Sequence, residues 1–349
     1  MALETNIHGI WGAKQAAKGT PATAPTTATT GKHLRLAAQG DIATQIGQGS
    51  EQFSDLGLFG DAQDFVTTII GQGAPPIHGT PDELAWLIWL FNSQETVTDI
   101  TGPPAKKKHV STPTPSLSWA TFYKRTGSSI IDRKRYSDSV ISQLEISAGT
   151  GQHILRAVPT IISLESGEQI AADPTLVLPT TKAFLWTEVD GALKLNGGVI
   201  KGPTQYTITL NRNLEPIYAD SPRPHDLQPG TPSLGVSVAM VLDQDAFDLA
   251  NLLLYGTATP AAGDKPTPHI GALGALDLTH TQKDDSGAVT GNSAQFEVPG
   301  VRWQKPGAVA VPNPGGGGGT LELTGSMRRV AGQPEWRSTV ICDQAAFTA

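Results

Sequence analysis

The sequence has little of several features that mark common protein classes. Cys342 is the one cysteine among 349 residues, which excludes a disulfide within the chain and a CxxC metal site. A chain without disulfides suits assembly in a reducing cytoplasm. Only 16% of the residues are charged and the net charge is −7, whereas domains with a nucleic-acid-binding groove are usually basic. We also find no secretory signal at the start and no apolar run near the roughly 18–20 residues of a membrane span. We therefore expect a soluble protein with no membrane partner.

Motifs for catalysis and cofactor binding are also missing. The chain contains no GxSxG, HExxH or GxxxxGK[ST] pattern, and its histidines stand singly, without the i, i+4 spacing of a metal site. The glycine run at residues 315–319 lacks the Lys-Thr or Lys-Ser step of a phosphate loop. A pair of carboxylates brought together only by the fold stays possible. We name no catalytic residue, no cofactor and no metal ligand, and we expect that the protein is not an enzyme.

The residues that are abundant indicate a mainly β protein. The 38 glycines and 26 prolines separate short segments rich in β-branched residues. In "GVSVAMVL" the apolar residues Val236, Val238, Met240 and Leu242 alternate with smaller ones, which is typical of a strand with one buried face. The segments "VISQLEISAG" and "HILRAVPTIISLE" follow each other at the distance of a hairpin.

One segment, "TPDELAWLIWLFN" at residues 80–92, instead predicts a helix. Thr80 is a suitable N-cap, Pro81 suits the first helical position, and Glu83 completes a capping box. Asn92 is a plausible left-handed stop. The interior is apolar on every side, so we expect it in the core. The predicted core residues are Leu84, Trp86, Leu87 and Trp89. The helix either fills the core of one β-domain or in part also faces a neighbouring subunit.

A second segment, "DQDAFDLANLLLYG" at residues 243–256, matches this helix without a gap. Its predicted core residues are Leu249, Leu252 and Leu253. Each helix follows an extended apolar segment, and each precedes a Pro-Thr-Pro sequence and a candidate strand. Because the same order of features occurs twice, we predict an internal duplication.

Two polar segments lie outside this repeat. Residues 1–30 have no hydrophobic period, so we expect an extended arm, either a disordered tail or an arm that docks on a neighbour through Ile10 and Trp11. Residues 93–112 form a long connection, which we expect to be a functional or mobile loop. Its cluster Lys106, Lys107, Lys108 and His109 is either a solvated tip or a contact for an acidic partner surface, with contact to DNA as a further alternative.

The chain resembles the tail tube proteins (major tail proteins) of long-tailed bacteriophages with non-contractile tails. The motifs that carry the resemblance extend over most of the chain: "WGAKQAAKGTPATAPT", "TPDELAWLIWLF", "SLSWATFYKR", "YSDSVISQLEISAGTGQHILRAVPTIISLESG", "TITLNRNLEP", "SVAMVLDQDAFDLANLLLYG" and "FEVPGVRWQK".

The resemblance implies a mainly β fold of two tandem tail-tube-like β-sandwich domains. Each would be packed by one α-helix and would contribute strands to the inner β-barrel of a ring. We expect the arm at residues 1–30, tube domain 1 at residues 31–170 and tube domain 2 at residues 171–349. Because tube proteins with one domain form sixfold rings, three chains of two domains would form a homotrimeric, pseudo-sixfold ring, with a homohexameric ring as the alternative.

The function implied is that of a structural virion protein, assembled in the host bacterial cytoplasm, whose stacked rings enclose a lumen that conducts DNA to the host. Its partners would be itself, the tape measure protein, the tail terminator and tip proteins, and phage DNA in transit, bound weakly and without sequence specificity. The alternatives are a receptor- or glycan-binding tail protein, a hydrolase, and the tube protein of a related injection or secretion machine.

Overall fold

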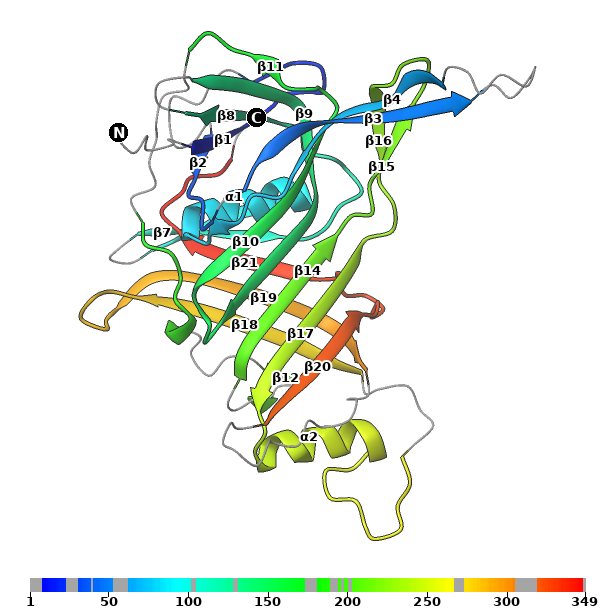
Figure 1. The fold of residues 1–349 in the computed structure, drawn as a ribbon. Helices are drawn as coiled ribbons and strands as arrows, with labels where there is room; N and C mark the ends of the chain where they lie inside the picture. The colour runs from blue at the N-terminus through cyan, green and yellow to red at the C-terminus, as the bar shows by residue number, and fades with distance from the viewer. Residues whose placement is uncertain are drawn as a thin grey trace, which may run out of the picture.

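The computed structural model describes residues 8–22, 31–38, 40–52, 62–101, 105–127, 131–172, 181–188, 194–195, 198–199, 203–266, 273–304 and 319–347. Strands make up 55% of the structure and helices 10%, which confirms the prediction of a mainly β fold. The strands form a hydrogen-bonded network whose pairs are all antiparallel, and Figure 1 shows that the network folds over itself into layers.

The front layer runs diagonally across Figure 1. Its order is β3–β4/β5–β10–β9–β14–β17–β20, and β9 joins the two halves of the chain by pairing with β10 on one edge and β14 on the other. Its strands are β3 (Ile42–Gln52), β4 (Ala62–Gly73), β5 (Ile77–His78), β9 (Asp132–Gly149), β10 (Gln152–Ser163), β14 (Pro203–Asn211), β17 (Ser233–Val241) and β20 (Thr320–Met327).

The back layer crosses behind the front layer, in the order β18–β19–β21–β7–β6. Its strands are β6 (Thr96–Ile100), β7 (Lys106–Ser111), β18 (Leu273–Lys283), β19 (Val289–Trp303) and β21 (Arg337–Cys342). A third group of strands lies along the N-terminal half of β9. This group contains β1 (His8–Lys14), β2 (Gly31–Leu34), β8 (Ala120–Thr126) and β11 (Glu168–Gln169).

The remaining elements are short. They are η1 (Trp186–Glu188), the pair β12 (Lys194–Leu195) and β13 (Gly198–Val199), and the pair β15 (Glu215–Tyr218) and β16 (Pro224–Gln228). Pro222, in the connection between β15 and β16, accepts a hydrogen bond from the backbone of Ile69 on β4. The β3–β4 and β15–β16 hairpins lie beside each other at the upper right of Figure 1.

Helix α1 (Pro81–Asn92) lies inside the fold and is buried along almost its whole length, as the sequence predicts. The capping box is confirmed, because Thr80 Oγ1 accepts from Glu83 N at 3.3 Å and donates to Glu83 Oε2 at 2.7 Å. The helix packs on β9 of the front layer and on β21 and β7 of the back layer. It ends at Ser93, in the left-handed region with φ 62°, one residue after the predicted stop.

Helix α2 (Gln244–Tyr255) is also found where the sequence predicts it, capped by Asp243 and ended by Gly256 with φ 79°. It lies at the lower end of the molecule in Figure 1, next to the ends of β17 and β20. Only Ala246, Ala250 and Leu253 of this helix are buried. The two helices are therefore alike in sequence but differ in how much of the chain covers them.

The two halves of the chain repeat one order of strand pairing. Each strand pair of the first half has a counterpart in the second. The pair β3–β4 corresponds to β14–β17, and the pairing of β10 with β4 and β5, before α1, corresponds to β20–β17, before α2. The pairs β9–β10, β8–β9 and β1–β8 correspond to β19–β20, β18–β19 and β12–β18. The last short strands also correspond, because β11 pairs with β9 as β21 pairs with β19.

Two expectations for the polar segments are wrong. Residues 8–14 do not form an extended arm but strand β1, which pairs with β8 and β2, while residues 1–7 and 23–30 lie outside the described residues. Residues 93–112 are not a long irregular loop either. They contain the antiparallel pair β6–β7, and β7 pairs on its other side with β21. Both segments are held by strands distant in sequence, which local patterns do not reveal.

Candidate functional surfaces

The outer face of the front layer is mainly polar on β9, β14, β17 and β20, whereas on β10 it also carries Ile154, Val158 and Ile162. Along its strands one set of side chains enters the core and the next set points away from it, because successive residues of a strand face opposite sides. On β9, for example, Leu144 and Ile146 are fully buried while Glu145 between them is half-buried. The outer set consists mainly of hydroxyl and amide side chains, among them Thr160, Gln205, Thr207, Thr209, Ser237 and Thr324.

The charge of this face is low and slightly negative. In the part of β9, β10, β14, β17 and β20 that forms it, the outward carboxylates are Glu145 and Glu322, and the outward basic side chain is Arg156. Glu322 also accepts a hydrogen bond from Ser237 on β17 at 2.9 Å. A face of this kind offers hydrogen bonds to water but no row of cations for phosphate groups.

The same face continues without a break from one half of the chain to the other. On β9 and β14, Glu145 lies opposite Thr209 and Ser147 lies opposite Thr207 in the strand register. The buried residues Leu144 and Ile146 lie opposite Leu210 and Ile208. The junction of the halves is thus a regular sheet with a polar outer side and an apolar inner side.

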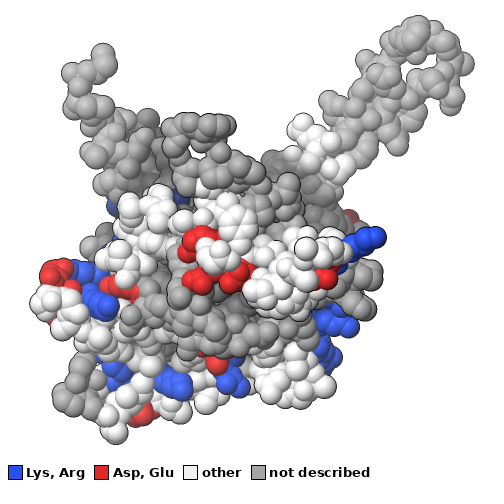
Figure 2. All heavy atoms as spheres, turned by 90° about the horizontal axis from the view of Figure 1, so that it is seen from below, with Lys and Arg blue, Asp and Glu red and all other residues white. Residues whose placement is uncertain are grey.

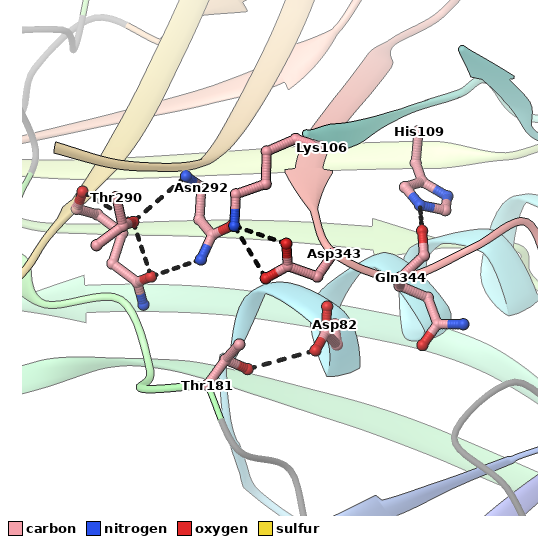
Figure 3. Close-up of polar contacts among 9 residues, drawn as sticks. Asp82, Lys106, His109, Thr181, Thr290, Asn292, Asp343 and Gln344 are labelled. Carbon is pink, nitrogen blue, oxygen red and sulfur yellow. Dashed lines mark hydrogen bonds and ion pairs between the residues drawn. The ribbon is translucent and has the colours of Figure 1, made fainter. Parts of the chain in front are cut away.

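The cluster at residues 106–109 does not form one cationic patch. Lys106 is buried and forms an ion pair with Asp343, with Nζ–Oδ distances of 2.8 and 2.9 Å (Figure 3). His109 is buried as well. Its Nδ1 lies 2.9 Å from Glu95 Oε2, and its Nε2 lies 2.8 Å from the carbonyl oxygen of Gln344. Lys107 forms an ion pair with Asp99, and Lys108 is half-buried.

Asp343 and Gln344, which contact Lys106 and His109, belong to the C-terminal segment, residues 343–347, which covers α1. Its Phe347 stacks on Trp89 with ring centroids 5.3 Å apart and donates its backbone N–H to Glu95 Oε1 at 2.8 Å. Lys32 on β2 forms a further hydrogen bond, to the side chain of Gln344. This segment was not predicted from the sequence. The apolar residue near its end, Phe347, was its one visible signal.

The predicted anchor of Ile10 and Trp11 lies inside the chain. Ile10 is 0% and Trp11 2% exposed, because β1 is inserted between β8 and β2. Trp11 contacts the ring of His33 on β2 edge-on, with centroids 5.2 Å apart. These two side chains, like Lys106 and His109, therefore stabilise the fold of the chain itself and are not an open surface.

The residues predicted for the helical core divide between the two helices. Leu84, Trp86, Leu87 and Trp89 on α1 are all buried, whereas on α2 Leu253 is buried and Leu249 is partly buried. The expectation for Leu252 is wrong for the single chain, because its side chain is 41% exposed. Leu87, the matching residue of α1, is 0% exposed on a helix that packs against both the front layer and the back layer.

Glu83 and His280 are ionisable side chains buried in the core. Burial raises the pKa of Glu83 to about 7, although its oxygens accept hydrogen bonds from Thr80 and from the backbone of Arg35. Burial lowers the pKa of His280 to about 4, and its ring contacts the hydroxyl of Tyr206. Among the described residues, no cluster of three or more His, Cys, Asp and Glu side chains could hold a metal ion.

Comparison with known families identifies the chain. The family model described as phage tail tube protein matches residues 19–327, which is most of the sequence and includes both helices and the whole front layer. The chain belongs to the phage tail tube protein family. No curated protein matches it in a direct comparison.

Membership of the tail tube family makes this chain a structural protein of the virion tail, which assembles with copies of itself and with other tail proteins. A tail tube protein acts by its surfaces, so the polar face and the two ends of the front layer are the features that bear on function. Within the described residues, no helix combines the length and apolar character needed to cross a membrane.

Proposed function

We propose that three copies of this chain form a ring with pseudo-sixfold symmetry and that rings stack into the tail tube. The observation that carries the proposal is the repeated order of strand pairing, with the two halves joined through β9 and β14. Each half acts as one tube domain, residues 31–170 and 171–349. If the halves were not equivalent, six chains per ring would be needed instead.

The polar face of the front layer lines the lumen in this proposal. Its apolar inner side needs cover, which α1 and the back layer supply in the first half. Closing the sheet into a ring removes its exposed edges. DNA passes the wall without being held, because a face with few cations releases few counterions and so gains little affinity for phosphate.

The partners follow from this role. The tape measure protein occupies the lumen before DNA does, and the terminator and tip proteins close the two ends of the tube. Assembly takes place in the cytoplasm of the host bacterium. The reaction that the tube supports is transport, so we assign no catalytic residue and no cofactor.

Electron microscopy of purified protein tests the proposal. We expect concentrated protein, or protein supplied with a tail-tip complex, to form hollow tubes whose rings contain three chains and six front-layer repeats. Rings of six chains would show that the two halves are not equivalent. Chains that remain single under all conditions, even with the tail-tip complex present, would contradict the role as a ring subunit.

The lining can be tested by charge reversal. Glu145→Lys combined with Glu322→Lys places cations on the polar face, whereas Asp285→Lys makes the same kind of change on the exposed connection between β18 and β19. We expect tubes of the double variant to retain DNA at low salt and release it as salt rises. Tubes of the wild-type protein and of the Asp285 variant should retain none. Equal retention by all three would place the lumen elsewhere.

A further inference from the structure

The junction between the two halves of the chain has two components. In the front layer, β9 of the first half pairs with β14 of the second from Gln143↔Asn211 to Gly149↔Gln205. Behind it, α1 of the first half packs against β21 and β19, which belong to the second half. Each half thus offers a strand edge on one side and a helix that needs cover on the other.

The strand pairing between β9 and β14 has a counterpart at the start of the front layer, where the outer edge of β3 has no partner strand among the described residues. β3 corresponds to β14, and within the described part of the chain β3 pairs with β4 alone. Ile46 lies opposite Ile69, whose N–H points away from β3 to the carbonyl oxygen of Pro222. Opposed residues of antiparallel strands point their N–H and C=O groups either at each other or both away. The groups of Ile46 therefore point to the outer edge, and those of Thr44, two residues earlier, do the same.

The position of Ile42 agrees with this orientation. Ile42 lies two residues before Thr44, and its carbonyl oxygen accepts a hydrogen bond from the side chain of Lys124 at 3.3 Å rather than one from β4. The outer edge of β3 holds the place in the first half that the edge of β14 facing β9 holds in the second. This stretch of edge is suited to pairing with one more strand.

The covered helix α1 has its counterpart at the other end of the front layer, in helix α2. α2 corresponds to α1 but leaves Phe247 43% and Leu252 41% exposed, and Val241, at the end of the strand that precedes α2, is 42% exposed. Figure 2, which looks onto this end, shows a small group of acidic side chains with uncharged side chains next to it. Residues 242–264 contain four aspartates and no lysine or arginine.

We propose that these two ends bind each other in neighbouring copies of the chain, so that the contact between chains repeats the contact between the halves. In this arrangement the outer edge of β3 receives a strand from one neighbour. The exposed face of α2 is covered by the N-terminal half of β9 with β11 in the other neighbour, because β9 and β11 correspond to the β19 and β21 that cover α1. The proposal rests on the ring function above and adds the surfaces that build the ring.

Charge supports the same pairing of surfaces. Residues 120–135, which span β8 and the start of β9, carry five basic side chains and one acidic one. Within the chain, Lys124 pairs with Asp41, Lys134 with Asp132 and Arg135 with Glu168, so the basic character is a property of the sequence of this segment and not of unpaired cations. An acidic helix end placed over a basic strand is favourable for the orientation and rate of association.

The contact is head to tail, so a chain blocked at one end keeps the other end active. Phe247→Lys combined with Leu252→Lys removes the apolar face of α2 and repels the basic segment. Thr44→Pro removes one outer-edge N–H of β3 without removing a bond to β4. We expect either variant alone to need at least about tenfold more protein to form rings, since one lost contact of this size is worth that factor.

Mixing the two variants gives the decisive result. An intact β3 edge from the helix variant can meet an intact α2 face from the proline variant, so the 1:1 mixture should form a dimer but no ring, measured by analytical ultracentrifugation. Val289→Lys, at an even more exposed apolar position outside both ends, and Thr44→Ala, which keeps the N–H, are the controls and should assemble like wild type. Ile46→Pro replaces Thr44→Pro if the latter lowers the melting temperature of the single chain.

The outcomes separate this contact from the ring function. Rings formed by either blocked variant at wild-type concentrations, or a mixture without dimers, would overturn the proposed contact even if wild-type protein makes tubes. A mixture that dimerises while wild-type chains make no tube would instead leave the contact standing and contradict the ring.

Discussion

The matched leucines Leu87 and Leu252 give a quantitative prediction about the two helices. Leu87 is 0% exposed, so Leu87→Ala removes apolar contacts and leaves a cavity, which costs about 2–5 kcal/mol of unfolding free energy. Leu252 is 41% exposed in the single chain. At about 0.8 kcal/mol per buried CH₂ group, and with water able to fill the space, Leu252→Ala should cost only about 1–1.5 kcal/mol.

The two variants should therefore be distinguished by two assays, one of the stability of the unassembled chain and one of ring formation. Urea unfolding of the unassembled chain should show a large loss of stability for Leu87→Ala and a small one for Leu252→Ala. The concentration needed for ring formation should rise for Leu252→Ala beyond what its small loss of stability explains, because the neighbour covers this side chain. Equal losses of stability in the two variants, or assembly of Leu252→Ala at wild-type concentrations, would refute the reasoning.

Three further predictions concern the core. Wild type gains stability with rising pH between about 4 and 6.5, because His280 stays protonated longer in the unfolded chain, and loses stability from about pH 4.5 to 7, because its buried Glu83 carboxyl must ionise. Glu83→Gln lacks the loss, so we expect its stability to rise with pH between about 4 and 6.5. Thermal unfolding of both proteins across this pH range checks the two effects. Trp89→Ala should cost about 3–5 kcal/mol, measured by urea unfolding, and a loss below about 1 kcal/mol would show that the ring is not part of the core. Lys106→Met should destabilise the chain and expose residues 343–347 to faster hydrogen exchange, whereas Lys107→Met, at an exposed ion pair, should do neither.

The sequence predicts best those features that depend on neighbouring residues. Thr80 and Glu83 stand three positions apart, so their capping box and the helix it begins are visible without any knowledge of the fold. The end of the helix is less local. Asn92 is not the left-handed residue because its side chain is used elsewhere, donating to Ser111 and accepting from Trp336.

The features that the sequence does not predict depend on partners far along the chain. β1 is recognisable only through β8, more than a hundred residues later, and β7 only through β21. The exposure of Leu252 has a related cause. Two helices of the same pattern were expected in equal surroundings, but in the single chain α1 lies between the two layers and α2 lies at the end of the front layer. Which residues form the polar face was not predicted, because strand alternation shows which residues share a side and not what that side meets.

The cover of α1 has a consequence for the synthesis of the protein. Trp89 and its neighbours leave the ribosome early, but β21 and Phe347, which shield them, are made roughly 250 residues later. At the usual 5–20 residues per second, that interval is on the order of 10–50 s. During that time the side of α1 that β21 and Phe347 cover has no permanent partner, although β9 on its other side is made much earlier. Each new subunit therefore needs protection, from its own unfinished layers or from a chaperone, until translation is complete.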